Sequence, residues 1–438
     1  MSTAPKKHIL FLSYYFPPMG GGGVQRIQKF IKYWDFDQYQ LSILTVKPSH
    51  FYAQDPSLQS DLPEQLSVYR SGTFDPFRVI YLIKKIFRRS NSKAVKSTFE
   101  SGHSSRRLIN YLLLPDSRIP WVPFAVHRIG KIHRSRPIDL IVATLPPFTT
   151  GTIASRIRRK WHIPYLLDLR DSWTHNLYMP RLSSIHGRIQ NRLEFQTIKL
   201  ASGLVFVNPD LRSYYQNKYS FLKNARLKLI RNGFDREDFS HLNLHKSDKP
   251  DSLFKIGIMG TIYSQGNAPY TLINALSVLK HQSNLLSQKL KIVFIGKWTR
   301  SFYAWVMSQT VHPQVEFIPY LPHRKALELA RTMNALALAL HSDLEGSEMV
   351  TPGRIYEYLY LKKPVLAMCA PKSDLAGLVQ KSNAGEVVDY QNTNGIVQIL
   401  TRWLTTGISS YSFENIESYD RQSQTDELLK FIRQILGD

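Results

Sequence analysis

The sequence has 438 residues, of which 43% are hydrophobic and 21% charged, a composition that supports two or three globular cores. One cysteine, Cys369, excludes an internal disulfide, and its apolar neighbours predict a buried hydrophobe rather than a nucleophile. The N-terminal residues lack a long apolar run, and no run reaches the roughly 18 residues of a membrane span. We therefore expect two domains in a protein that is neither secreted by a standard signal nor integral to a membrane.

The net charge of +24 is concentrated in the first half of the chain. Residues 1–200 carry 30 Lys and Arg against 12 Asp and Glu, a net charge of +18, and residues 201–438 carry +6. Residues 74–93 predict a basic amphipathic helix, and residues 106–136 mix aromatic side chains with further cations. The helix has Phe74, Phe77, Ile80, Ile83 and Phe87 on one side and Lys84, Lys85, Arg88 and Arg89 on the other.

This helix suits the surface of an anionic bilayer, and a solvated helix packed on the first domain is the alternative. Nucleic acid is the competing partner for so basic a chain. We do not favour it, because the sequence has no recognition-helix, zinc-finger or RNP-like motif.

The first predicted unit, residues 8–34, is a buried strand, a glycine turn and an amphipathic helix. The four turn residues are Gly20, Gly21, Gly22 and Gly23. Glycines let backbone N–H groups approach a ligand, and the positive end of the helix points into the turn, so the motif favours a phosphate site. A tight corner without a ligand is the alternative. The dinucleotide fingerprint and the P-loop ending are both absent.

Further apolar runs alternate with helical patterns in the rhythm of a parallel sheet. The first series of strands lies at residues 40–48, 138–146, 164–172, 203–209 and 226–233, and the second at 254–261, 290–297, 315–321, 335–341, 364–370 and 385–389. The predicted fold class is α/β, with two Rossmann-like doubly wound domains that face a central cleft. We expect an N-terminal domain at 1–235, a linker at 236–252, a C-terminal domain at 253–410 and a helical segment at 411–438 that packs on the first domain.

The strongest motif of the second domain lies at residues 342–367. Thr351 is predicted to cap a helix whose N-terminus forms a second anion site, with Gly353 allowing close approach and Arg354 supplying charge. Glu357 lies off the apolar side of this helix, where a carboxylate accepts hydrogen bonds from ribose hydroxyls. A solvated carboxylate that complements the helix dipole is the alternative. Together the features suggest a nucleotide diphosphate site.

Four motifs carry a resemblance to a known family: SYYFPPMGGGGVQR, LVFVNPDL, LIRNGFDREDF and PGRIYEYLYLKKPVL. Over nearly its whole length the chain resembles the family 4 retaining glycosyltransferases, also called group 1 glycosyltransferases, which have a GT-B-type fold. The resemblance implies transfer of a sugar from a nucleotide diphosphate donor with retention of configuration, without an essential metal and with no cofactor. The scattered histidines show no metal-ligand spacing.

The resemblance also implies roles for particular residues. The four glycines of the first turn face the donor diphosphate, Gly260 and Thr261 meet it from the second domain, and Glu357 holds the ribose. Tyr320 and Leu321 fall where the family contacts the base.

Residues 164–173 form the strand and loop that usually carry a histidine near the reacting sugar, and here Arg170 takes that place. Asp168, Arg170 and Asp171 are the reaction-centre candidates, with an acceptor-orienting or phosphate-neutralising role rather than that of a general base. For Asp171 and Trp173, a capping carboxylate and an aromatic plug are the alternatives.

The sequence departs from the family pattern at two places. The first of two glutamates spaced eight apart would fall at Met349, so Glu348 or Glu345 is the nearest acidic candidate. The basic pair after the first strand of the second domain is absent, so Lys297 or Arg354 is expected to neutralise the diphosphate. An inactive homologue is the alternative that these departures leave open.

The predicted function is a glycosyltransferase of cell-surface polysaccharide or glycolipid biosynthesis, cytoplasmic and peripheral on the cytoplasmic face of the membrane. Its predicted partners are a nucleotide diphosphate sugar, a glycan or lipid-linked acceptor and an anionic membrane surface, with no nucleic acid. A nucleotide-sugar epimerase of the same fold and a non-catalytic membrane or nucleic-acid binding protein are the alternatives. The sequence leaves open the donor sugar, its base, the acceptor, the linkage and the oligomeric state.

Overall fold

The computed structural model describes residues 5–20, 22–47, 57–74, 113–176, 183–242, 253–408 and 411–437. Contacts within the chain divide it into two compact units. Unit 1 contains the described residues up to Asn232 together with those from Arg421 onward, and unit 2 contains residues 233–420. The basic helix predicted at 74–93 lies outside the described residues except for Phe74.

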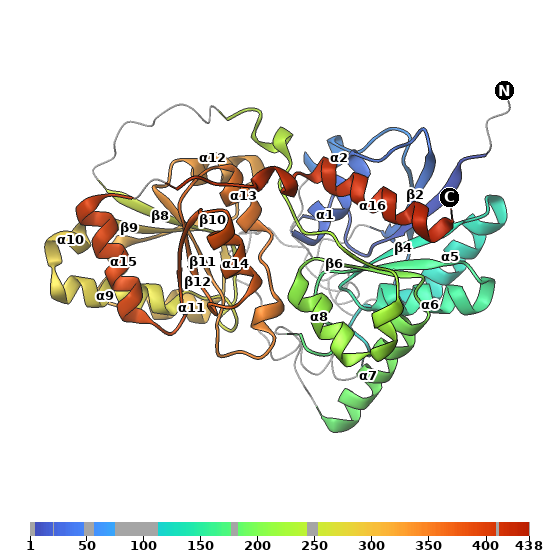
Figure 1. The fold of residues 1–438 in the computed structure, drawn as a ribbon, viewed down its shortest axis with the longest axis horizontal. Helices are drawn as coiled ribbons and strands as arrows, with labels where there is room; N and C mark the ends of the chain where they lie inside the picture. The colour runs from blue at the N-terminus through green and yellow to red at the C-terminus, as the bar shows by residue number, and fades with distance from the viewer. Residues whose placement is uncertain are drawn as a thin grey trace, which may run out of the picture. The chain divides into compact units, whose positions relative to one another are not determined.

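Unit 1 is built on a seven-stranded parallel sheet with the order β3-β2-β1-β4-β5-β6-β7 (Figure 1). The strands are β1 Lys7–Leu12, β2 Tyr39–Val46, β3 Ser67–Ser71, β4 Leu140–Leu145, β5 Tyr165–Leu169, β6 Gly203–Phe206 and β7 Leu227–Leu229. The α-helices are α1 Gly22–Lys32, α2 Ser57–Ser60, α5 Val122–Ser135, α6 Thr149–Trp161, α7 Ser184–Lys199, α8 Pro209–Lys218 and α16 Arg421–Leu436, and the 3-10 helices are η1 Ile119–Trp121 and η2 Ser220–Asn224.

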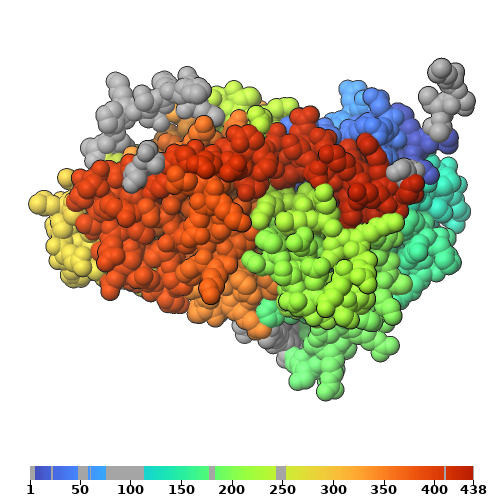
Figure 2. Space-filling view, viewed as in Figure 1, coloured from blue at the N-terminus to red at the C-terminus, as the bar shows by residue number. Residues whose placement is uncertain are grey.

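The sequence dictates this sheet through continuous apolar runs. Every residue of β4 is buried, as expected for a parallel strand covered on both faces by helices. Helix α1 begins inside the glycine run and places Ile27 and Ile31 in the core. Leu428 and Ile432 of α16 join the same cluster, so the end of the chain covers α1. Figures 1 and 2 show α16, in red, on the surface of unit 1.

Unit 2 repeats the architecture with a six-stranded parallel sheet in the order β10-β9-β8-β11-β12-β13. The strands are β8 Phe254–Ile262, β9 Leu290–Trp298, β10 Val315–Pro319, β11 Ala335–Ala339, β12 Val365–Met368 and β13 Gly385–Val388. The helices are α9 Tyr270–Gln282, α10 Asn284–Gln288, α11 Arg300–Met307, α12 His323–Arg331, α13 Arg354–Tyr360, α14 Asp374–Lys381 and α15 Thr393–Thr406, with 3-10 helices η3 Arg236–Phe239, η4 His312–Gln314, η5 Ser347–Met349 and η6 Ile416–Tyr419.

The segment after β7 packs on unit 2. Phe234 and Phe239 are each 2% exposed in the core of this unit, and the Phe234 ring stacks on Tyr360 with its centroid 4.4 Å away. Phe234 also bridges to Asp420, just before α16 begins. The domain limits expected from the sequence stay a prediction beside this division by contacts.

The two doubly wound α/β domains predicted from the sequence are confirmed, with a strand at each predicted run. Cys369 is fully buried, as its apolar neighbours predict. Within the described parts of the chain, no helix combines the length and the apolar character that a membrane crossing requires.

Candidate active site

The glycine turn of unit 1 and the loop after β5 lie at the same edge of the sheet, because both follow the carboxyl ends of parallel strands. A Cβ on Gly23 would stand only 2.8 Å from Nη1 of Arg170, so glycine at this position lets the guanidinium lie against the first turn of α1. Gly20 is buried and Gly22 is the first residue of α1, whereas Gly21 lies outside the described residues. The structure therefore brings two predicted site elements together.

Arg170 is held in place by the end of β4. Its backbone N–H and its Nε donate to the carbonyl of Leu145 at 3.0 and 3.2 Å, and Nη2 donates to the carbonyl of Pro146. Burial lowers the pKa of Arg170, which the neighbouring Asp171 carboxylate counteracts. Burial raises the pKa of Asp171, and Arg170 opposes that shift. The guanidinium and the positive end of α1 thus converge on the turn, an arrangement that suits an anion.

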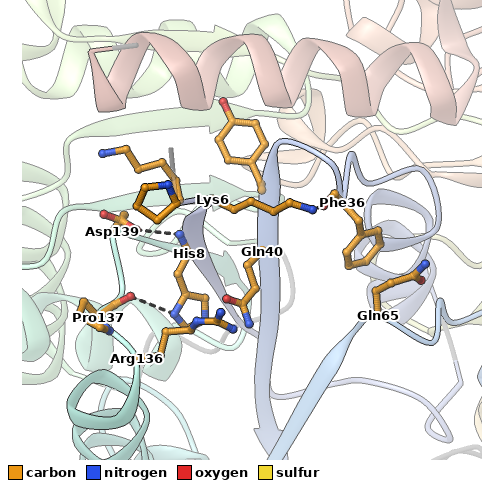
Figure 3. A pocket seen from close by; sticks show the side chains of 11 residues that line it. Lys6, His8, Phe36, Gln40, Gln65, Arg136, Pro137 and Asp139 are labelled. Atoms are coloured by element: carbon orange, nitrogen blue, oxygen red, sulfur yellow. Dashed lines mark hydrogen bonds between the residues drawn. The ribbon is translucent and has the colours of Figure 1, made fainter. Parts of the chain in front are cut away.

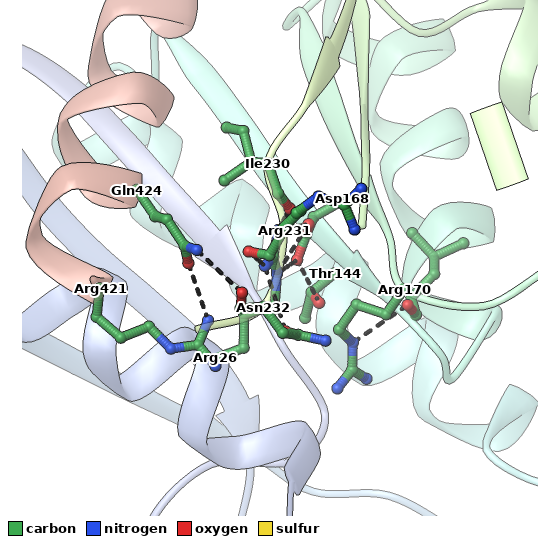
Figure 4. Close-up of polar contacts among 10 residues, drawn as sticks. Arg26, Thr144, Asp168, Arg170, Ile230, Arg231, Asn232, Arg421 and Gln424 are labelled. Carbon is green, nitrogen blue, oxygen red and sulfur yellow. Dashed lines mark hydrogen bonds and ion pairs between the residues drawn. The ribbon is translucent and has the colours of Figure 1, made fainter. Parts of the chain in front are cut away.

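Asp168 lies behind this loop in a buried ion pair with Arg26 of α1 (Figure 4). The two side chains are 3% and 1% exposed, with Arg26 Nη2 2.8 Å from Asp168 Oδ1. Thr144 donates to Oδ2 at 3.0 Å, and Arg26 also donates to the carbonyls of Ile230 and Arg231. The pair therefore joins α1, the end of β5 and the residues after β7. Arg26 was not predicted from the sequence, because its partner is 142 residues away.

A buried glutamate on α7 fixes the rest of the loop after β5. Glu194 is fully buried and accepts hydrogen bonds from the hydroxyls of Tyr215 at 2.7 Å, Tyr219 at 2.9 Å and Thr174 at 2.9 Å, and from Lys218. The Tyr215 hydroxyl in turn accepts from the backbone N–H of Trp173 at 2.9 Å. The loop that carries Arg170 is therefore tied to α7 and α8 a few residues further on.

Trp173 itself is 2% exposed and stacks on Phe148, with ring centroids 4.9 Å apart. Its Nε1 donates to Gln190 at 2.7 Å. These contacts match the aromatic-plug alternative for this residue. Burial, followed by the Glu194 carboxylate, raises the pKa of Tyr215 well above its ordinary value, so the hydroxyl keeps its proton and acts as a donor.

In unit 2, the predicted residues gather at the carboxyl ends of β8, β9 and β10. Gly260 has a φ of +103°, and a Cβ there would stand 2.6 Å from Nη1 of Arg354. Thr261 pairs in register with Lys297, whose Nζ lies 5.3 Å from the ring centroid of Tyr320. The Tyr320 residue is 39% exposed. A glycine again makes room for an arginine, here beside a lysine and an accessible aromatic ring.

Leu321 packs partly buried on the core of unit 2, directly before α12. The first residue of that helix, His323, contacts Glu357 of α13, with 2.8 Å between Nε2 and Oε1. Its Nδ1 lies 3.8 Å from Oδ2 of Asp238, and the His323 and Glu357 side chains are 18% and 14% exposed. Glu357 is thus neither a fully solvated nor a fully buried carboxylate. The sequence analysis missed His323, because no local pattern links positions 34 residues apart.

The start of the helix before Glu357 was predicted wrongly. α13 begins at Arg354, with Gly353 as its N-cap, and the Thr351 hydroxyl instead donates to Asp374 of α14 at 2.7 Å. The Asp374 carboxylate, brought close by the fold, outcompetes the local capping bond. Gly353 is exposed, and a Cβ there would meet nothing within 4 Å. The positive charge at this place therefore comes from Arg354 more than from the dipole of a seven-residue helix.

The acidic candidates before this helix differ in exposure. Met349, at the position of the family's first glutamate, is 4% exposed, whereas Glu348 and Glu345 are exposed. Glu348 in η5 thus stays the nearest acidic candidate for the role of the family's first glutamate. Among the residues that the structure describes, no group of three or more His, Cys, Asp or Glu is arranged to hold a metal ion.

A cavity of about 580 Å³ lies at the other edge of the unit 1 sheet, by the amino ends of β1, β2 and β4 (Figure 3). His8 borders it and is fixed by the Pro137 carbonyl at 3.1 Å and the Ser42 hydroxyl at 2.9 Å. Because a carbonyl only accepts, Nδ1 carries the proton. None of the predicted site residues lines this cavity.

Residues 93–233 match the family model described as Glycosyl transferase 4-like domain. This part of the chain is similar to a glycosyl transferase 4-like domain. No curated protein matches the chain.

Solved structures match the chain over nearly its full length. One is sucrose-phosphate synthase from Thermosynechococcus elongatus, with a TM-score of 0.64, 13% identity and coverage of 99% of this chain and 100% of that one. A second is a mutant of S. aureus TarM in complex with fondaparinux, alpha-GlcNAc-glycerol and UDP, with a TM-score of 0.61, 12% identity and coverage of 99% and 100%. A third is alpha,alpha-trehalose 6-phosphate synthase from Burkholderia multivorans, with a TM-score of 0.60, 10% identity and coverage of 99% of this chain and 97% of that one.

These matches confirm the GT-B-type fold and the resemblance to group 1 glycosyltransferases. The family match covers residues 93–233, and the solved structures, at 10–13% identity, show the fold.

Proposed function

We propose that this chain transfers a sugar from a nucleoside diphosphate sugar to an acceptor hydroxyl, with retention of configuration at the anomeric carbon. One observation carries the proposal: each unit sets a glycine against an arginine at the carboxyl edge of its sheet. The pairs are Gly23 with Arg170 and Gly260 with Arg354. Guanidinium groups recognise phosphate oxygens through paired hydrogen bonds, and the absent side chains let each guanidinium lie close against the backbone at this edge. The family match supports a sugar as the transferred group, and retention rests on the resemblance alone.

In the proposed reaction, the bond between the anomeric carbon and the diphosphate oxygen breaks, and a bond to the acceptor oxygen forms. The acceptor proton goes to the departing diphosphate. Negative charge develops on that leaving group, so positioned cations lower the barrier. Arg170, Lys297 and Arg354 are the cations that we assign to it, and no residue of the chain acts as a nucleophile. Asp171 orients the acceptor, and Asp168 positions the loop through Arg26.

We assign the nucleoside to unit 2. Glu357 accepts hydrogen bonds from the ribose hydroxyls while His323 fixes one of its oxygens. Tyr320 and Leu321 contact the base, and the exposure of the Tyr320 ring suits stacking. The glycines of the first turn, Thr261, Glu348 and Gly353 complete the proposed donor contacts.

For the acceptor, we propose a lipid-linked glycan of cell-surface polysaccharide or glycolipid biosynthesis, used at the cytoplasmic face of a membrane. The net charge of +18 on residues 1–200 supports this part of the proposal, since anionic headgroups attract such a surface. The acceptor would then be presented where the protein is held.

A thermal-shift screen tests the donor assignment. The wild type is heated with UDP, GDP, ADP and CMP and with their common sugar conjugates, since a ligand at 100 times its Kd stabilises the native state by about 2.7 kcal/mol. We expect one nucleotide family to raise the melting temperature. Glu357→Gln should lose the shift, and the control Glu316→Gln, a change at a surface pair with Lys291, should keep it. A shift that survives Glu357→Gln contradicts the ribose assignment, and no shift with any nucleotide contradicts the donor site.

A further inference from the structure

The inner side of helix α7 is largely polar, whereas its outer side carries exposed apolar residues. Its buried positions are His186, Gln190, Glu194, Thr197 and Ile198. Its exposed positions include Ile185, at 69% exposure, and Ile189, at 43%. A surface helix of a globular protein ordinarily shows the reverse pattern. Packing against the described residues therefore does not account for these two apolar side chains.

The exposed apolar residues alternate with cations. We define the outer face of α7 as Ile185, Arg188, Ile189, Arg192, Phe195 and Lys199. Their spacings of three and four residues place them on one side of the helix. All six are exposed, and the glutamate of α7 is buried on the opposite side. The outer face therefore combines apolar side chains with positive charge and no acidic residue.

A neighbouring aromatic residue extends the outer face. Phe221 of η2 is 39% exposed, and its ring centroid lies 5.9 Å from that of Phe195. Nζ of Lys199 lies 5.5 Å from the Phe195 ring. Among the described residues, four of the nine exposed large hydrophobic side chains thus belong to this one patch. Scattered exposure would need no explanation, but a cluster of this kind marks an interaction surface.

We propose that the outer face of α7 binds the surface of an anionic lipid bilayer. The inference deepens and rests on the proposed function, because it names a surface for the membrane contact. Isoleucine and phenylalanine side chains enter the boundary between headgroups and acyl chains, while arginine and lysine keep their charges at the headgroups. A second copy of the chain fits less well, because a two-fold contact would set Arg188 and Arg192 against the same cations.

The buried side of α7 ties this surface to the candidate active site. Glu194 accepts from the Thr174 hydroxyl and Gln190 accepts from Trp173 Nε1, so α7 packs on the loop after β5 that also carries Arg170. Ile185 and Ile189 lie in the first half of the helix. A membrane held by the outer face would thus present a lipid-linked acceptor at the edge that carries the reaction-centre candidates.

Vesicle sedimentation with the full chain tests the proposal. Vesicles of phosphatidylcholine alone are compared with vesicles that contain 30% phosphatidylglycerol, a composition that we set at roughly physiological anionic content. The variants are I185S/I189S and R188Q/R192Q, and the control is L285S, which changes an isolated hydrophobe that is 75% exposed on α10. We expect the wild type and the control to bind anionic vesicles only. Each double variant should bind at least about tenfold more weakly, and added salt should weaken wild-type binding.

Equal binding by the wild type and both double variants would overturn the proposal, as would absence of wild-type binding to anionic vesicles. Self-association or capture of an acidic protein that both double variants abolish, without vesicle binding, would assign the face to a protein instead. The nucleotide thermal shift is measured on the same proteins and should be unchanged in the α7 variants. Vesicle binding as expected with no nucleotide shift supports the surface and rejects the donor site, so the two failures are distinguishable.

Discussion

The two units differ in how deeply they bury the charged residues near the candidate site. In unit 1, the charges near the candidate site are internal: Arg26 and Asp168 are 1% and 3% exposed, and Glu194 is fully buried. In unit 2, the side chains of His323 and Glu357 remain 18% and 14% exposed.

This difference in burial distinguishes charged residues that fix the structure of the site from charged residues that can contact a ligand. In a buried ion pair, the attraction between the charges is offset by the cost of removing them from water. The pair therefore contributes little net stability, and its main effect is to fix the positions of the elements that it joins. A partly exposed carboxylate can exchange water for a ligand hydroxyl. We therefore assign rigid positioning of Arg170 to the charges of unit 1 and nucleoside recognition to those of unit 2.

Removal of Arg26 is expected to have the largest effect. Arg26→Gln leaves the Asp168 carboxylate buried without its cation and should lower the free energy of unfolding of unit 1 by about 3–5 kcal/mol. The control Lys291→Gln breaks the exposed pair with Glu316 in unit 2 and should cost about 0–1 kcal/mol. Hydrogen exchange of the β5 and β9 amides in urea measures the two changes. Equal decreases in the free energy of unfolding would contradict the proposed difference between internal and exposed charges.

Tyr215→Phe tests the link between the buried glutamate and the loop after β5. The change removes a donor to Glu194 and the acceptor of the Trp173 N–H, and it should lower the free energy of unfolding by about 1–3 kcal/mol. Donor turnover should fall more than the nucleotide thermal shift, since the loop carries Arg170 whereas the nucleoside is assigned to unit 2. Tyr214→Phe, which keeps the ring stacked on His175, is the control. Unchanged turnover in Tyr215→Phe would contradict the role of Tyr215 in positioning the loop that carries Arg170.

His323→Ala should affect nucleotide binding rather than folding. Loss of the hydrogen bond to Glu357 frees the carboxylate to move, so nucleotide affinity should fall about fivefold to tenfold. Calorimetric titration with the nucleotide found in the screen gives this ratio. His241→Ala, which breaks the pair with the exposed Glu328, should leave the affinity as it is. A loss of stability without a loss of affinity in His323→Ala would make this contact structural.

The smallest expected effect is a pH dependence in unit 1. Burial lowers the pKa of His8 below its ordinary value of 6.5. Above pH 6.5 the imidazole is neutral in both states; as the pH falls below 6.5 the unfolded chain binds the proton first, so stability declines until the lower folded pKa is passed. Opening free energies of β1 amides at pH 7.5 and 5.5 should differ less in His8→Gln than in the wild type. The slope is at most about 1.4 kcal/mol per pH unit.

The local sequence was enough to predict every strand except β3 at the edge of the unit 1 sheet, which is only partly buried. Residues 140–145 are apolar except for Thr144, and a parallel strand covered on both faces buries all six side chains. The glycine turn was recognisable for the same reason, since α1 begins within the run. These features depend on neighbours along the chain.

The partners of the site residues could not be predicted from the sequence. Arg26 meets Asp168 across 142 positions and His323 meets Glu357 across 34, and neither pair leaves a local pattern. The cap predicted at Thr351 failed because Asp374, 23 residues later, takes its hydroxyl. The inverted helix α7 was missed for a related reason, because the donors that satisfy Glu194 come mostly from α8 and the β5 loop.

Product analysis tests the central claim most directly. The nucleotide sugar selected by the thermal-shift screen is incubated with the protein, with and without a membrane lipid extract, and the anomeric proton signals are followed by NMR. The account predicts that the donor signal decays and free nucleoside diphosphate appears mainly when the extract is present, and that Arg354→Ala slows the decay by about 100-fold or more. Conversion of the donor to an epimeric nucleotide sugar without any extract would contradict glycosyl transfer and assign the fold to an epimerase.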